Sequence, residues 1–334
     1  MLRVHFTSED IARVRVAAAP DPLWEITNSF QVLVRNENGL SFGQWRRQVK
    51  SRLPPPVRTL AALLPPRGYS PDFLTPDLEG SFDLESAVDM VLSTPRNALR
   101  SDLSRLAVSQ NRSGRLPTVI DALARGDPES LRRLGAIMHM YHQNALAPFW
   151  PRIRAQVDAD LAGRARAVLA GGTESLLAGF RPVLRWEPPV LEADYPVDRD
   201  LHLDGRGLLL QPSYFCVGRP VMLATPKLPP VLVYPVQHTL GWARAGGPAD
   251  RGTELGALIG RTRAAILEDV VSGRTTSELA ARRGISGAAA SQHTAVLRRA
   301  GLLLSTRHSK HILHTITPTG LALLNSPLSA PIDV

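Results

Sequence analysis

Residues 274–304 constrain the fold of this chain more than any other stretch, because they predict two short helices joined by a tight turn. Thr275 and Glu278 have the spacing of a capping box, so the first helix is expected to begin there. Gly284 marks the turn, and Ser286 is placed to cap the second helix through its hydroxyl group. Two short helices that cross closely around a glycine turn form a helix-turn-helix.

The second predicted helix, about residues 287–300, ends at Gly301, because glycine suits the left-handed conformation that closes many helices. Its first turns carry small or short polar side chains, which let a helix approach the floor of the major groove of DNA. Its last turns carry Arg298 and Arg299 beside apolar residues. That mixture suits a helix that packs on a core and also contacts phosphates.

Two apolar or β-branched runs, at 302–305 and 312–317, predict the strands of a β-hairpin after this helix. The segment that joins them, about 305–312, is basic and polar. Its basic side chains include Arg307, His308 and Lys310. We therefore expect a basic wing beside the pair of helices.

Five short motifs occur together in this part of the chain. They are Ser-Glu-Leu-Ala at 277–280, Gly-Ile-Ser at 284–286, Ser-Gln-His at 291–293, Val-Leu-Arg-Arg-Ala-Gly-Leu at 296–302 and Ile-Thr-Pro-Thr-Gly at 316–320. With these motifs, residues 255–324 resemble the winged-helix domain of ArsR-type bacterial transcription regulators, over about a fifth of the chain. The resemblance implies a homodimer that binds double-stranded DNA sequence-specifically and regulates transcription.

This sequence departs from the pattern of that family at two places. The usual apolar pair inside the second helix of the motif is replaced by Ala290 and Thr294. The aromatic residue of the wing is replaced by His314. The motif of thiolate ligands that metal-sensing members carry in the first helix is also missing, so thiolate sensing of a metal is not expected.

In the resembled family, the exposed face of the second helix reads DNA near its N-terminus, at positions that correspond here to 287, 288, 291, 292 and 295. Only Ser291 and Gln292 offer hydrogen-bonding side chains there, because an alanine can do no more than touch a thymine methyl group. For Gln292, a bidentate contact with adenine and a contact with a phosphate are equal alternatives. The candidate DNA-binding residues are Arg274, Thr275, Ala288, Ser291, Gln292, His293, Arg298, Arg299, Arg307, His308 and Lys310.

The charge distribution favours duplex DNA as the partner. Residues 255–320 contain nine Lys and Arg residues and three acidic residues, so their net charge is 9 − 3 = +6 of the +9 carried by the whole chain. No Phe, Tyr or Trp follows Trp242, whereas proteins that bind single strands stack bases on aromatic side chains. The main alternative is a degenerate winged helix with a structural or protein-interaction role.

The rest of the chain predicts a mainly α fold with minor β structure. Residues 1–180 are expected to form a mostly helical domain for dimerisation or for sensing an unidentified small-molecule effector. Residues 181–236 are expected to be a β-rich segment of the same domain, and 237–254 a linker to the winged helix-turn-helix at 255–324. The strand, capped helix and Pro-Asp-Pro break within residues 2–22 are similar to the N-terminal region, of unknown function, of actinobacterial ArsR-type regulators.

No catalytic motif is present, and we expect neither enzymatic activity nor a cofactor; an enzyme with an appended DNA-binding domain is the least favoured alternative. His139 and His142, with Asp158 and Asp160 nearby, were considered as metal ligands, and two ordinary helical histidines are the preferred interpretation. Cys216 is the only cysteine, and its apolar neighbours predict a buried strand residue rather than a nucleophile. A single cysteine, with no long apolar run and no signal peptide, predicts a cytoplasmic protein that does not associate with membranes.

Overall fold

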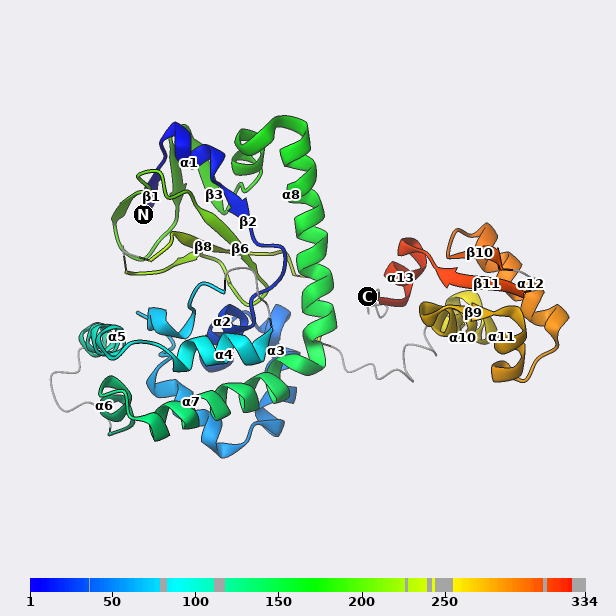
Figure 1. Cartoon of the computed structure of the whole chain (residues 1–334), viewed down its shortest axis with the longest axis horizontal. Coiled ribbons are helices and arrows are strands. Elements are labelled where there is room, and N and C mark those ends of the chain that lie inside the picture. The colour runs from blue at the N-terminus through cyan, green and yellow to red at the C-terminus, as the bar shows by residue number, and fades with distance from the viewer. Residues whose placement is uncertain are drawn as a thin grey trace. The chain divides into compact units, whose positions relative to one another are not determined.

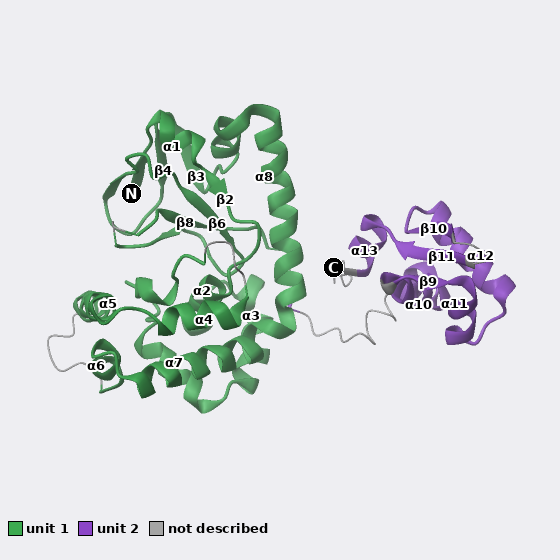
Figure 2. Ribbon diagram, in the orientation of Figure 1, with its two compact units in different colours: residues 1–240 green, residues 241–334 purple. Residues whose placement is uncertain are grey.

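The computed structural model describes residues 1–35, 37–78, 83–110, 118–225, 228–238, 242–243, 255–308 and 311–325 (Figure 1). The chain divides into two compact units, Met1–Leu240 and Gly241–Val334 (Figure 2). The described residues are mainly helical and contain three small sheets. Most of the predicted linker at 237–254 lies outside the described residues.

Unit 1 contains eight α-helices within its described residues. They are α1 (Ser8–Ala12), α2 (Pro22–Arg35), α3 (Gly39–Arg52), α4 (Leu84–Leu92), α5 (Arg96–Ser109), α6 (Thr118–Ala124), α7 (Pro128–Tyr141) and α8 (Trp150–Ala178). Shorter helical segments are Pro55–Ala62, Asp72–Leu74, His142–Leu146 and Ala147–Phe149. None of the described helices is both long enough and apolar enough to span a bilayer.

Two four-stranded sheets complete unit 1. One has the order β3-β4-β1-β5 and is formed by Leu184–Glu187, Val190–Ala193, Leu2–His5 and Arg199–His202. The other has the order β2-β6-β8-β7 and is formed by Arg15–Val16, Leu209–Ser213, Val231–Pro235 and Val221–Met222. Figure 1 shows these strands at one end of unit 1, most of the helices at the other, and α8 running along both.

The first residues of the chain belong to the β structure, which is therefore not confined to the expected segment 181–236. Strand β1 is antiparallel to β4 and parallel to β5, and β2 is parallel to β6. The side chains of Leu2 and Val4 are completely buried. Strand β1 lies between β4 and β5, which follow it by nearly two hundred residues, so these pairings depend on tertiary structure rather than on the local pattern.

Helix α2 is the central helix of unit 1, because every residue from Pro22 to Phe30 is buried. The side chain of Asp21 accepts hydrogen bonds from the backbone N–H groups of Leu23 and Trp24 at 2.7 and 3.2 Å and so caps the helix. The Glu25 carboxylate accepts hydrogen bonds from two backbone N–H groups after β6, at 2.6 and 3.0 Å. These bonds join α2 to the second sheet.

Unit 2 consists of helices around a three-stranded antiparallel sheet of order β10-β11-β9. Its elements are α10 (Arg261–Asp269), a short helical turn at Val270–Ser272, β9 (Arg274–Thr275), α11 (Thr276–Arg283), α12 (Gly287–Arg299), β10 (Leu303–His308), β11 (His311–Ile316) and α13 (Pro318–Asn325). Both predicted helices and both predicted strands of the 274–317 region are therefore present, and each strand of the hairpin extends closer to its tip than we expected.

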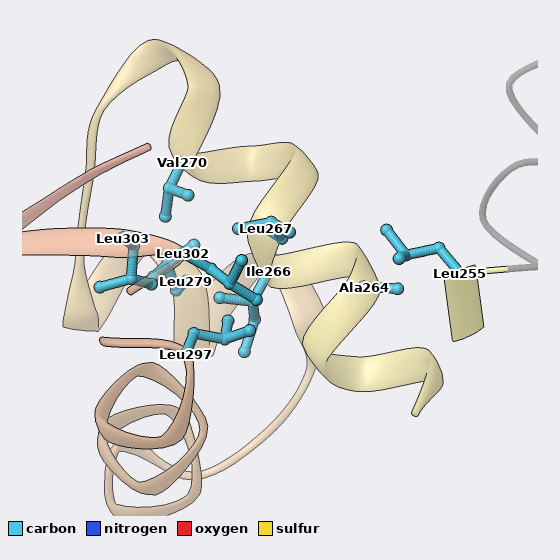
Figure 3. Packing of buried hydrophobic residues seen from close by; sticks show 9 residues of the cluster. All are labelled: Leu255, Ala264, Ile266, Leu267, Val270, Leu279, Leu297, Leu302 and Leu303. Carbon is cyan, nitrogen blue, oxygen red and sulfur yellow. The ribbon is translucent and has the colours of Figure 1, made fainter. Parts of the chain in front are cut away.

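One apolar core holds unit 2 together (Figure 3). Its members come from α10, α11 and α12, from the turn at Val270–Ser272, from the start of β10, and from Leu255 before α10. They are Leu255, Ala264, Ile266, Leu267, Val270, Leu279, Leu297, Leu302 and Leu303. Burial of a leucine or isoleucine side chain contributes about 1.5–3 kcal/mol, so each of these side chains stabilises unit 2 substantially.

Candidate nucleic-acid interface

The capping box predicted at the start of α11 is present. The backbone N–H and the hydroxyl group of Thr275 donate to the Glu278 carboxylate at 2.8 and 3.0 Å, and the hydroxyl oxygen accepts from the Glu278 backbone N–H at 3.4 Å. Gly284 ends the helix in the left-handed conformation, with φ = 62°. The Thr275 hydroxyl is thus bonded within the protein, although we named it as a candidate DNA contact.

Helix α12 also has the ends that the sequence predicted. The Ser286 hydroxyl accepts a hydrogen bond from the backbone N–H of Ala289 at 3.1 Å. After the helix, Gly301 has φ = 72°, and the N–H of Leu302 donates to the carbonyl group of Leu297 at 2.9 Å. These two local motifs set the length of α12 and the direction in which the chain enters β10.

The two faces of α12 differ in character. Ala290, Thr294 and Leu297 are buried against unit 2. Thr294 occupies a position that is apolar in the resembled family, and its hydroxyl group donates to the carbonyl group of Ser291 at 3.0 Å, so its burial leaves no polar atom unsatisfied. The opposite face exposes Ala288, Ser291, Gln292, Arg298 and Arg299, while His293 is half-buried.

Two arginines of α11 have a structural role that we did not predict. The buried carboxylate of Asp269, at the end of α10, accepts from Nε of Arg282 at 3.3 Å and from Nε of Arg283 at 2.7 Å. Arg283 also donates through Nη2 to the carbonyl group of Ala265 at 2.7 Å. Arg282 and Arg283 therefore hold α11 against α10. A count of charges along the sequence could not distinguish these two arginines from the arginines that are candidates for phosphate binding.

The other candidate basic side chains come from β9, α12 and β10. Arg298, Arg299 and Arg307 are exposed and form no ion pair with any residue that the structure describes. Arg274 is half-buried, and its Nη1 donates to the carbonyl group of Gly273 at 3.1 Å. Of the other wing candidates, Lys310 and the side chain of His308 lie outside the described residues.

His314 bridges three elements of unit 2. It lies in the middle strand β11, opposite Arg274 of β9 and Ser305 of β10, and only 3% of its surface is exposed. Its Nε2 is 2.9 Å from the hydroxyl oxygen of Thr276, the first residue of α11, and its Nδ1 is 2.8 Å from that of Ser305. Burial, followed by the charge of Arg298, lowers the pKa of the imidazole.

The two histidines that were candidate metal ligands each contact another group of unit 1. Nδ1 of His139 is 3.0 Å from the carbonyl oxygen of Gly135, and the ring of His142 packs edge-on against Trp150 at a centroid distance of 5.3 Å. Burial lowers the pKa of His142 to about 4. Within the described ranges, no cluster of three or more His, Cys, Asp or Glu side chains could hold a metal ion.

The two aspartates beside these histidines, and Cys216, are also engaged within unit 1. Asp158 lies 3.8 Å from Nε of Arg154, and Asp160 accepts from Arg164 at 3.1 Å and from the Tyr234 hydroxyl at 2.8 Å. The thiol of Cys216 is buried and lies 3.2 Å from the carbonyl oxygen of Arg219. Its burial raises the pKa of the thiol, so it lacks the thiolate character of a nucleophile.

No protein-family model, curated protein or solved structure matches this chain. The resemblance to ArsR-type regulators therefore rests on the five sequence motifs between 277 and 320.

Proposed function

We propose that unit 2 is a winged helix-turn-helix domain, that this protein binds double-stranded DNA sequence-specifically through it, and that it regulates transcription as a homodimer. The observation that carries the proposal is the exposed face of α12. This face contains small and short polar side chains along its first turns and two arginines at its end, and the helix contains no acidic residue. A helix with such a face fits the major groove and meets the phosphates at its rim.

The short side chains of α12 allow the helix to come close to the bases of the major groove, and they leave few groups on it that could form hydrogen bonds with base edges. Ser291 and Gln292 are exposed one turn from the start of the helix, where a recognition helix contacts base edges. Gln292 suits the adenine edge, which offers one acceptor and one donor in the major groove, and Ala288 suits contact with a thymine methyl group. We therefore propose that the operator contains A·T pairs at the centre of each half-site.

The charges support contacts with the backbone on both sides of this helix. Arg274 precedes α11, Arg298 and Arg299 end α12, and Arg307 lies in the hairpin, so phosphates beside all three elements have a basic partner. In a homodimer, these four arginines give about eight phosphate contacts. Unit 1 is then left for dimerisation or for sensing a small-molecule effector.

Binding of the full chain to duplexes tests this proposal. Random 30-base-pair duplexes are enriched over several rounds of selection, and the affinity of the best sequence is measured between 50 and 300 mM salt. We expect one enriched motif and a slope of log affinity against log salt steeper than about −5, since each neutralised phosphate contributes about −0.9. A slope near zero, or no enriched motif, would contradict sequence-specific binding.

A further inference from the structure

His314 is a buried imidazole between two hydroxyl groups that lie at the edge of the proposed DNA interface. Thr276 is the first residue of α11, and Ser305 lies on β10, two residues before the exposed Arg307. Both hydroxyl residues are half-buried, so each is part of the surface of unit 2. The ring nitrogens are 2.9 and 2.8 Å from these two hydroxyl oxygens.

The protonation state of the ring decides what these hydroxyl groups can do. In either neutral tautomer, one ring nitrogen carries no hydrogen and must accept a hydrogen bond, so one of the two hydroxyl groups points its proton inward. In the imidazolium form, both nitrogens donate, and both hydroxyl groups accept. Thr276 and Ser305 can then both direct their own protons outward to an acceptor such as a phosphate oxygen.

The surroundings of the ring keep it neutral in the absence of an anion. On β9, Arg274 is the residue opposite His314, and on α12 the charge that acts on the ring is that of Arg298. The groups that α11 and β10 present to the ring are the two hydroxyl groups. Burial and the charge of Arg298 are the causes that lower its pKa. The carboxylate of Glu278, on α11, is bonded to the backbone N–H and hydroxyl group of Thr275. Phosphates placed beside Arg274 and Arg298 would reverse the sign of the local potential.

We propose that His314 takes up a proton when unit 2 binds DNA, and that the imidazolium then orients the hydroxyl groups of Thr276 and Ser305 toward backbone phosphates. The inference rests on the proposed function and adds a regulatory property to the same interface, namely that affinity for duplex DNA rises as the pH falls. His314 acts as a positioning residue, because it contacts the hydroxyl groups rather than the DNA.

Calorimetry and NMR spectroscopy of the full chain test the proposal. Proton uptake on binding of the selected duplex is measured at pH 7 by titration in two buffers of different ionisation enthalpy. The variant His314→Asn keeps a donor and an acceptor but does not titrate in this range. We expect the wild type to take up more protons than this variant, and its affinity to rise several-fold between pH 8 and pH 6, by less than tenfold per pH unit because one proton is involved.

A control variant and a direct measurement separate His314 from other groups. His202→Gln removes an exposed histidine of unit 1, outside the proposed interface, and should take up as many protons on binding as the wild type. The Cε1–Hε1 signal of His314 is also followed against pH with and without DNA, so the test does not depend on the folding of a variant. Equal proton uptake by wild type and His314→Asn, or a His314 pKa that DNA leaves unchanged, would overturn the inference. Either result would leave the proposed function standing, whereas absence of duplex binding would remove that function itself.

Discussion

The carboxylate of Asp269 and the guanidinium group of Arg283 form an ion pair, with 2.7 Å between Oδ2 and Nε, that joins the end of α10 to the end of α11. Asp269 is almost completely buried, whereas Arg283 is half-buried. A buried carboxylate is tolerable only with such partners, because an isolated charge in the interior is costly. The pair therefore contributes to the angle between the two helices, and the arginine is not available for DNA.

Replacing Asp269 with Asn should destabilise unit 2 by roughly 1–3 kcal/mol, because the two arginines lose their charged acceptor while the amide keeps the shape of the side chain. Chemical denaturation followed by circular dichroism, with hydrogen exchange of the α11 amides, measures the loss. Glu268→Gln is the matched control, since it removes the same charge from an exposed neighbour, and it should change stability by less than about 0.5 kcal/mol. Equal effects of the two substitutions would refute a special role for Asp269.

Arg299→Ala and Arg282→Ala remove the same charge from two exposed positions with different partners. Arg299 has no ion pair within the described residues, whereas Arg282 lies 3.3 Å from Asp269. We expect Arg299→Ala to make the salt dependence of DNA affinity shallower, by a slope of about 1 for each protomer, and Arg282→Ala to leave it nearly unchanged. The same reduction in both variants would show that the pair with Asp269 opens when DNA binds.

Gln292→Ala should weaken binding to the selected operator by roughly 1–3 kcal/mol and relax the preference at one base pair of each half-site, because the exposed amide is the best-placed reader of adenine. Arg298→Ala should weaken all sequences by a similar factor, since its expected partner is a phosphate. Affinities over a series of single-base operator variants distinguish the two. If Gln292→Ala lowers every affinity equally, specificity comes from DNA shape or from the wing.

The stability of unit 1 should fall as the pH rises from about 5 to about 7. Burial raises the pKa of both Asp21 and Glu25 to about 7, so the folded state binds protons more tightly than the unfolded chain does. Well below the ordinary pKa values of 3.8 for Asp and 4.5 for Glu, both carboxyl groups are protonated in either state, and the cost of ionising them in the interior grows until the pH passes 7. That cost is about 3–4 kcal/mol per group, since each pKa unit corresponds to about 1.4 kcal/mol. Denaturation at several pH values measures the decrease, and Glu25→Gln should make it smaller. A flat profile in the wild type would show that these carboxyl groups ionise without cost.

Much of unit 2 could be predicted from the sequence because its signals are local. The Thr275–Glu278 capping box, the glycines after each helix and the Ser286 cap involve residues within about four positions of one another, so a short segment specifies its own ends. The apolar spacing of α12 likewise separates its buried face from its exposed one. The candidate surface at Ser291 and Gln292, in contrast, was implied by the resemblance to ArsR-type regulators, and the exposure of both side chains is compatible with it.

The tertiary structure decided what depends on residues far apart in the chain. Strand β1 pairs with β4 and β5, which follow it by nearly two hundred residues, and the alternation of apolar residues in 2–6 does not identify a partner. The contacts of His314 likewise depend on residues that are far apart in the chain. The sequence showed only that a histidine replaces an aromatic residue, and the folded sheet places its ring between Thr276 and Ser305. Local motifs determine where helices begin and end, whereas long-range packing determines which polar groups meet, because each such contact requires the whole core to form first.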